Sequence, residues 1–169
     1  QQGSILWQSR PLDDYTLNAL RSAISWVPQE AFLFSASVAD NIALGQPDAS
    51  RAEIERVAQL AAVHDDILRL PQGYDTPVGE KGVSLSGGQR QRVAIARALL
   101  SPAPLLMLDD ALSAVDTQTE TAILQHLRAA RQGRTLLIVS HRLSAVVDAD
   151  DILVLRHGRV TERGTHAQL

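Results

Sequence analysis

The 169 residues, 45% of them hydrophobic, are enough for one domain with a real core. A net charge of −3 with no basic stripe argues against a nucleic-acid partner, and the absence of cysteine excludes disulfides and thiolate metal sites. The sequence also contains no apolar run of about 18 residues that could cross a membrane, so we expect any membrane role to come through a partner.

The first part of the chain predicts two short strands with a helix between them. Ser4 to Gln8 alternates as a strand does, and Asp13 or Asp14 is expected to cap a short helix. Ala23 to Val27 predicts a second strand, which the following proline ends because it has no N–H to donate. Gln29 comes next, in what by itself is an ordinary loop.

A loop with two aromatic residues then leads to a predicted helix. Phe32 and Phe34 are the only phenylalanines in the chain; we expect at least one of them in the core, although together they also suggest an apolar patch for a partner. Ser50 and Glu53 form a capping box. It opens one helix, ending before Pro71, whose apolar positions fall close to one face: Ile54, Val57, Leu60, Ala61, Ile67 and Leu68.

The stretch Leu85-Ser86-Gly87-Gly88-Gln89 precedes a run of good helix formers, so a helix begins there. Ser86 and Gln89 fit a second capping box. Two glycines in a first turn need a reason, since each costs a helix interior about 1 kcal/mol relative to alanine. We interpret them as leaving backbone N–H groups uncovered, which together with the helix dipole predicts a site for a phosphate.

Two apolar runs predict buried strands of a parallel sheet. Leu105 to Leu108 is continuous in hydrophobicity and delivers Asp109 and Asp110 to its carboxyl end, where open α/β sheets bind ligands. Thr135 to Val139 predicts a second buried strand that leads to His141 at the same edge.

The segments around the second strand predict two helices and a hairpin. Thr117 and Glu120 are expected to cap a helix that Gly133 closes. Arg142 to Val147 predicts a short helix. Beyond it, Asp151 to Leu155 predicts a strand that turns at His157-Gly158 into the last hairpin.

The string L-S-G-G-Q-R-Q-R-x-x-x-A-R-A, from Leu85 to Ala98, resembles the signature motif of the ATP-binding-cassette (ABC) ATPases. Four further motifs resemble that family in its order: Gln29 the Q-loop glutamine, Asp109 the Walker B acid, Asp116 the D-loop and His141 the switch histidine. The resemblance implies an α/β, P-loop NTPase-like fold with a mainly parallel core sheet flanked by helices. It further implies an α-helical signature subdomain inserted at about 29–100, the core subdomain being 1–28 and 101–169.

The same resemblance implies the chemistry of the site. ATP and Mg²⁺ are the implied cofactors, with Asp109 and Gln29 at the metal, and with Asp110, His141 and Gln29 as catalytic residues. Residues Leu85, Ser86, Gly87, Gly88 and Gln89, together with Asp116, would contact nucleotide across an ATP sandwich formed with a second cassette.

Two departures from the family pattern modify these expectations. The only lysine, Lys81, is followed by Gly82, so the sequence has no G-x-x-x-x-G-K-[ST] phosphate loop. We expect an N-terminal portion to be missing and the 169 residues alone to be inactive. Asp110 stands where the family normally has glutamate and is about 1.5 Å shorter, which predicts a weak site and a heterodimer in which this cassette completes its partner's competent site.

The loop of Phe32 and Phe34 and the segment around Glu80 resemble the parts of multidrug-type exporter cassettes that face the membrane domains. This places the intact protein at the cytoplasmic face of the inner membrane. The alternatives are a translation-factor ATPase, a catalytically silent regulatory cassette, and a chromosome-maintenance ATPase. The last needs long coiled-coil arms between Q-loop and signature, whereas only 56 positions separate Gln29 from Leu85.

Overall fold

A three-stranded parallel sheet forms the centre of the protein in this computed structural model, which describes residues 3–130 and 133–169. The strand order is β3 (Ile24–Val27), β6 (Leu105–Asp109), β7 (Thr135–Val139), with β6 paired to both neighbours in parallel register. All three strands therefore end at one edge of the sheet, as expected for an α/β fold with a parallel core.

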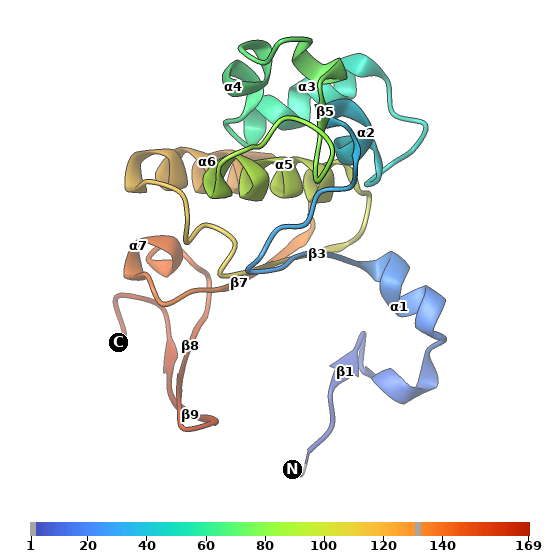
Figure 1. The fold of residues 1–169 in the computed structure, drawn as a ribbon. Coiled ribbons are helices and arrows are strands. Elements are labelled where there is room, and N and C mark those ends of the chain that lie inside the picture. Colours follow the sequence, from blue (N-terminus) through green and yellow to red (C-terminus); the bar gives the residue numbers. More distant parts are fainter. Residues whose placement is uncertain (1–2, 131–132) are drawn as a thin grey trace.

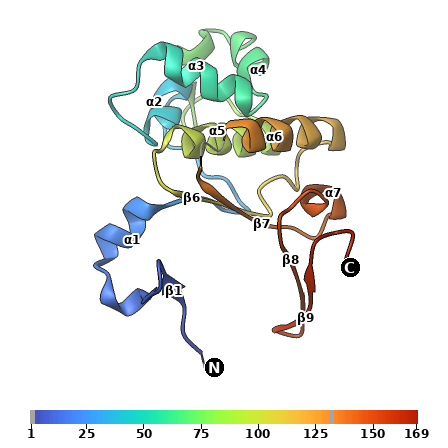
Figure 2. The same cartoon turned by 180° about the vertical axis from the view of Figure 1, so that it is seen from behind.

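Helices cover one face of this sheet. Both α5 (Gly87–Leu100) and α6 (Thr117–Ala130) lie over it (Figures 1 and 2). Val27, Leu106 and Leu108 point to this side and are buried. Residues of opposite parity point to the other face, which no described helix covers.

The prediction that Thr135–Val139 is a buried strand is wrong, because exposed and half-buried positions alternate along β7. As the outer strand with helices on one face only, β7 leaves Leu137 and Val139 exposed, on the same face as Trp26 of β3 but separated from it by β6.

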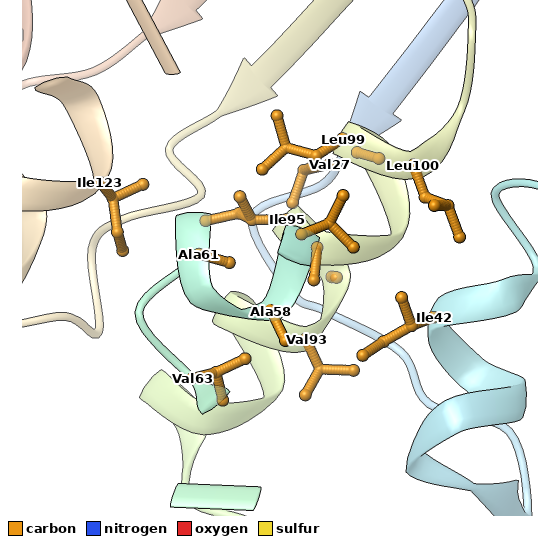
Figure 3. Packing of buried hydrophobic residues seen from close by; sticks show 14 of the residues in the cluster. Val27, Ile42, Ala58, Ala61, Val63, Val93, Ile95, Leu99, Leu100 and Ile123 are labelled. Carbon is orange, nitrogen blue, oxygen red and sulfur yellow. The ribbon is translucent and has the colours of Figure 1, made fainter. Parts of the chain in front are cut away.

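Three further helices pack onto α5 on its other side: α2 (Val38–Ala43), α3 (Arg51–Leu60) and α4 (His64–Leu68). Figure 3 shows their apolar side chains meeting those of α5, with Ile42, Ala58, Val93 and Ile95 all buried. This common core holds α5 between the sheet and the other helices.

The single helix expected from Ser50 to Leu68 is two helices, although its predicted capping box with Glu53 is confirmed. Ala62 lies at φ +55° between them. A residue in the left-handed region ends a helix and turns the chain, so α4 begins anew at His64. Short strands β4 (Ala36–Ser37) and β5 (Pro77–Val78) pair antiparallel beneath these helices.

The two ends of the chain form hairpins. β1 (Leu6–Trp7) pairs with β2 (Arg10–Pro11), so the first predicted strand is shorter than expected. α1 (Leu17–Ala23) is capped by Thr16, whose hydroxyl accepts from the Ala19 N–H. The expectation that Asp13 or Asp14 would cap it is wrong, because both lie in a preceding 3₁₀ helix, Leu12–Asp14.

After β7 come α7 (Leu143–Val146), β8 (Ile152–Arg156) and β9 (Arg159–Gly164). The predicted turn at His157-Gly158 is confirmed, with both residues at positive φ as a tight hairpin requires. Within residues 3–130 and 133–169, no helix combines the length and hydrophobicity needed to span a membrane.

Candidate functional site

The edge where the parallel strands end brings Gln29, Asp110 and His141 together. The Gln29 Nε2 donates to Asp110 Oδ2 at 3.4 Å, and His141 Nδ1 lies 3.2 Å from Asp110 Oδ1. The His141 side chain is 73% exposed and that of Asp110 only 17%. Three residues far apart in the sequence thus form one cluster, open to solvent on the histidine side.

Asp110 sits at the centre of this cluster in an unusual backbone conformation. Its φ is +48°, and its N–H donates to the Val139 carbonyl at 2.8 Å. Aspartate is among the non-glycine residues that enter the left-handed region most readily. The short side chain reaches both Gln29 and His141 from this position.

Asp109 is the last residue of β6 and shares a sheet face with Met107, because alternate residues of a strand point the same way. This is the face that the described helices leave uncovered. No group of three or more His, Asp or Glu side chains in the described part of the chain could hold a metal ion by itself. Mg²⁺ is usually bound by one or two carboxylates together with waters and substrate phosphates, and the carboxylate of Asp109 and the amide oxygen of Gln29 are oxygen donors of that kind.

The signature stretch forms the start of α5 as predicted. The Ser86 hydroxyl accepts from the Gln89 N–H at 3.1 Å, and Gln89 Oε1 accepts from the Ser86 N–H at 2.9 Å, which confirms the capping box. Gly87 and Gly88 are the first two helical residues, so their N–H groups have no partner within the helix. These donors remain available to an anion.

Glycine is also needed at position 88 for a structural reason that the sequence did not reveal. A Cβ built there would lie 2.8 Å from the backbone oxygen of Ala114, closer than any real Cβ contact. At Gly87 the nearest atom would be the Ala114 Cβ at an ordinary 3.7 Å. The interpretation of both glycines as uncovered donors is therefore incomplete, because Gly88 is also required by the close approach of a second segment.

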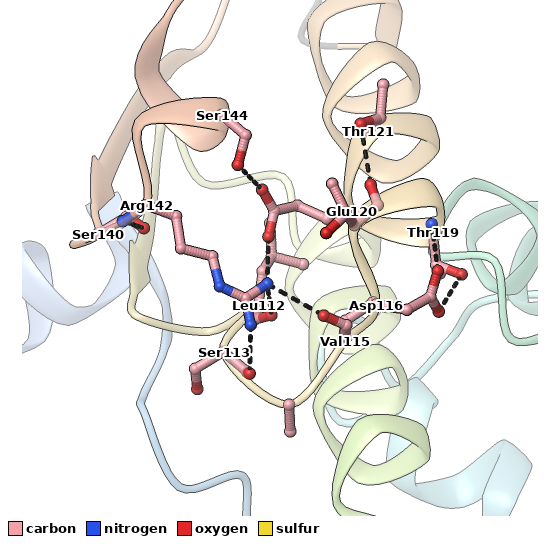
Figure 4. Close-up of polar contacts among 12 residues, drawn as sticks. Leu112, Ser113, Val115, Asp116, Thr119, Glu120, Thr121, Ser140, Arg142 and Ser144 are labelled. Carbon is pink, nitrogen blue, oxygen red and sulfur yellow. Dashed lines mark hydrogen bonds and ion pairs between the residues drawn. The ribbon is translucent and has the colours of Figure 1, made fainter.

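That second segment is the β6–α6 loop, residues Ala111–Asp116, and Arg142 holds it from one side (Figure 4). The Arg142 guanidinium donates to the Leu112, Ser113 and Val115 carbonyls at 3.3, 2.7 and 3.0 Å. One planar guanidinium thereby binds three backbone carbonyls of the loop.

Glu120 anchors this arginine. It is fully buried, accepts from Arg142 Nη1 at 2.6 Å, and accepts from the Ser144 hydroxyl at 2.6 Å. The expected cap of Thr117 with Glu120 is therefore wrong, since the glutamate points into the protein to pair with a residue 22 positions away.

Asp116 caps α6 instead. Its two carboxylate oxygens accept from the Thr119 N–H at 3.0 Å and the Thr119 hydroxyl at 2.7 Å. The bond from the Thr119 N–H, followed by that from its hydroxyl, lowers the pKa of Asp116 below its ordinary value. The closure expected at Gly133 follows residues 131–132, which lie outside the described residues; α6 is described to Ala130.

Gln91 holds the β6–α6 loop from the other side, and sequence reasoning missed it. This residue of α5 is only 5% exposed. Its Nε2 donates to the Gln29 carbonyl at 3.0 Å and to the Ser113 hydroxyl at 3.3 Å, while its Oε1 accepts from the Ala114 N–H at 3.1 Å. The available signal was its place on α5, one turn before the buried Ala94 and Ile95, where an apolar residue would be ordinary.

The two aromatic residues and Glu80 lie on one surface. Phe32 and Phe34 pack edge to face, with ring centroids 5.0 Å apart, and remain 64% and 51% exposed. The expectation that at least one enters the core is wrong. β4 pairs with β5 just beyond them, and Phe32 and Glu80 both line a cleft of about 750 Å³.

Arg97 of α5 fixes this aromatic loop. It donates to the carbonyls of Phe32 and Asn41 at 3.2 and 2.7 Å. Asn41 in turn accepts from the Phe34 N–H at 2.8 Å and donates to the Phe34 carbonyl at 3.0 Å. Burial lowers the pKa of Arg97, and the exposed rings are thereby tied to the helix that carries the signature stretch.

Comparison with known proteins gives consistent matches. The chain is 58% identical over 165 residues to the multidrug resistance-like ATP-binding protein MdlA of Escherichia coli, covering 98% of this chain and 28% of that protein. It is 49% identical over 166 residues to the human mitochondrial iron-sulfur clusters transporter ABCB7, covering 98% of this chain and 22% of that protein. The chain thus spans less than a third of the length of these relatives.

A solved structure of a bacterial Atm1-family ABC exporter with ATP bound matches with a TM-score of 0.93 and 48% identity, over 99% of this chain and 30% of that one. This match supports the P-loop NTPase-like fold expected from the motifs. The family model for ABC transporters matches residues 1–113. On these grounds the chain belongs to the ABC transporter family.

Proposed function

We propose that the chain is part of the ATP-binding cassette of an ABC exporter and that the intact protein hydrolyses ATP to drive export. The observation that carries this is the cluster of Gln29, Asp110 and His141 at the carboxyl edge of the parallel sheet. Ligands of open α/β sheets bind at this edge. In this proposal residues 29–100 are the helical subdomain, and 1–28 with 101–169 belong to the core.

The residues have separate roles in this proposal. Asp109 and Gln29 hold Mg²⁺, which neutralises phosphate charge. Asp110 orients the attacking water, and His141 contacts the γ-phosphate from the exposed side of the cluster. Phosphoryl transfer needs mostly positioning and charge stabilisation, so a cluster of polar side chains held in place suits this reaction.

The signature stretch serves a second cassette. Ser86 and the free N–H groups of Gly87 and Gly88 meet a phosphate of ATP bound by the other subunit, as a helix start can. Leu85 and Gln89 frame this site. Asp116, at the end of the β6–α6 loop, faces the same subunit in the ATP sandwich.

The surface of Phe32, Phe34 and Glu80 is the proposed contact with the membrane domains. Its exposed rings suit an apolar helix end better than water. An exporter is favoured over a translation-factor or chromosome-maintenance ATPase because the matched relatives and the matched structure bear the names of transporters. The protein would then act at the cytoplasmic face of the inner membrane.

We further propose that this cassette is the weaker half of a heterodimer. Its signature helix start is intact, whereas Asp110 is shorter than the usual glutamate, and a misplacement of about 1 Å can cost about 10²-fold in rate. The strongest function of the chain would be to complete its partner's site.

The test uses the full-length protein with its partner cassette, and compares Ser86→Arg with Asp110→Glu. We expect Ser86→Arg to abolish most ATP turnover, because the added side chain fills the place of the partner's phosphate. Asp110→Glu should raise turnover modestly. If Ser86→Arg leaves turnover intact, the division of labour is wrong; if the wild-type pair has no turnover, a silent regulatory cassette is the better description.

A second measurement addresses the phosphate loop. The purified 169 residues should show no micromolar binding of Mg·ATP in calorimetry, because they include no G-x-x-x-x-G-K-[ST] loop to bind the β- and γ-phosphates. Micromolar binding would contradict this part of the proposal.

A further inference from the structure

We propose that Gln91 is a positioning residue that locks the Gln29 loop and the β6–α6 loop to the signature helix. The inference rests on the proposed ATPase function but concerns contacts that no motif assigns. If it holds, the residues around the nucleotide and the loop facing the second cassette are set by one buried amide.

The contacts of Gln91 span three segments. Its Nε2 donates to the Gln29 carbonyl, 62 positions earlier, and to the Ser113 hydroxyl, 22 positions later. Its Oε1 accepts from the Ala114 N–H. The side chain therefore uses both ends of its amide and joins the Gln29 loop to the β6–α6 loop.

Burial makes these bonds consequential. Gln91 is 5% exposed, and a buried amide costs free energy unless it is hydrogen-bonded. An apolar side chain would fill the same place on α5 without that cost. The polar choice is explained by the two loops it joins rather than by packing.

Contacts on the far side complete a ring. Ser113 is also held through its carbonyl by Arg142, the residue after His141. His141 contacts Asp110, and Asp110 contacts the side chain of Gln29, whose carbonyl returns to Gln91. Displacing Gln91 therefore opens a closed circuit of contacts around the proposed reaction site.

Gly88 adds an independent reason for the same conclusion. It lets the first turn of α5 approach the Ala114 oxygen, while Gln91, one turn later, binds the Ala114 N–H. The carbonyl oxygen and the N–H of Ala114 thus both lie against α5. The β6–α6 loop therefore has little freedom to move without the helix.

The test compares Gln91→Met and Gln91→Glu in the full-length protein with its partner. Methionine keeps the length and loses every hydrogen bond. Glutamate keeps an acceptor for the Ala114 N–H but loses the donor to Gln29. Gln125→Met, at an exposed position of α6, is the matched control.

Two readouts are measured. Hydrogen exchange at the Ala114 amide should become about tenfold faster in Gln91→Met, the effect of losing one hydrogen bond, and should stay slow in Gln91→Glu. In both variants kcat for ATP should fall about 10- to 100-fold, the size expected from a small misplacement, with KM for ATP within about twofold of wild type. Gln125→Met should change neither.

The outcomes separate the possibilities. If both variants keep wild-type kcat, or if kcat falls only in step with the unfolding temperature, Gln91 is a structural residue and the proposal is overturned. If the wild-type protein itself has no turnover, the proposed function fails, and unchanged exchange at Ala114 in Gln91→Met would then overturn the inference separately.

Discussion

Replacing Gly88 with alanine tests the close approach of the β6–α6 loop to the signature helix. The new Cβ would lie 2.8 Å from the Ala114 oxygen. That oxygen cannot retreat cheaply, because Gln91 binds the N–H of Ala114 and Arg142 binds the Ser113 carbonyl. Overpacking of this kind costs about 1–3 kcal/mol in the free energy of unfolding.

Gly87→Ala is the matched control, because its Cβ would meet only the Ala114 Cβ at 3.7 Å. The exchange of glycine for alanine should gain up to about 1 kcal/mol from helix propensity. Gly88→Ala should gain a similar amount from helix propensity, so this contribution cancels and the two variants should differ by the overpacking cost, about 1–3 kcal/mol. Each kcal/mol shifts Tm by about 2–4 °C in a domain of this size.

The assay is thermal unfolding of the full-length protein in the absence of nucleotide, followed for both variants side by side. Nucleotide is left out so that binding at the helix start does not contribute to Tm. Equal Tm values for Gly87→Ala and Gly88→Ala would refute the reasoning, since both positions would then tolerate a methyl group.

Further substitutions probe the buried ion pair, the core and the dependence of stability on pH. Glu120→Ala leaves Arg142 without its buried carboxylate and should lower the free energy of unfolding by about 3–5 kcal/mol in urea titrations; a loss under 1 kcal/mol would contradict the burial described. Ile95→Ala should cost about 2–5 kcal/mol, whereas Leu137→Ala, at an exposed position, should stay within about 0.5 kcal/mol of wild type in the same assay. Burial raises the pKa of Tyr74 to about 12, so stability present below pH 10 should be lost as pH rises toward 12, and urea midpoints of Tyr74→Phe should decline less over that interval.

The helix caps and strands that depend on neighbouring residues could be predicted from the sequence. Ser86 with Gln89 and Ser50 with Glu53 identify helix starts because each pair acts within one turn. The run Leu105–Leu108 identifies the central strand because a continuous apolar run is typical of strands in parallel sheets. Gln29, Asp110 and His141 each follow a strand of the parallel sheet. Because parallel strands end at the same edge, these three residues are brought together there.

What could not be predicted depends on contacts between distant segments. Glu120 looks like a capping residue until Arg142, 22 positions away, is brought beside it by the fold. The break at Ala62 has no glycine to announce its positive φ. Gln91 looks like an ordinary part of a helix, and the sequence explains Gly88 only as an uncovered donor, because the loop that contacts both lies more than 20 positions further along the chain.

Asp116 joins the end of the β6–α6 loop to the start of α6 through a helix cap that depends on its negative charge. A carboxylate whose pKa is lowered by the folded state stabilises that state above its ordinary pKa of 3.8 and ceases to do so as pH falls through the lower, folded value. At neutral pH Asp116 is therefore negatively charged, and its cap holds the end of the β6–α6 loop at the start of α6. Protonation of Asp116 would weaken its bonds to Thr119 at the start of α6, while Arg142 and Gln91 would still hold the loop.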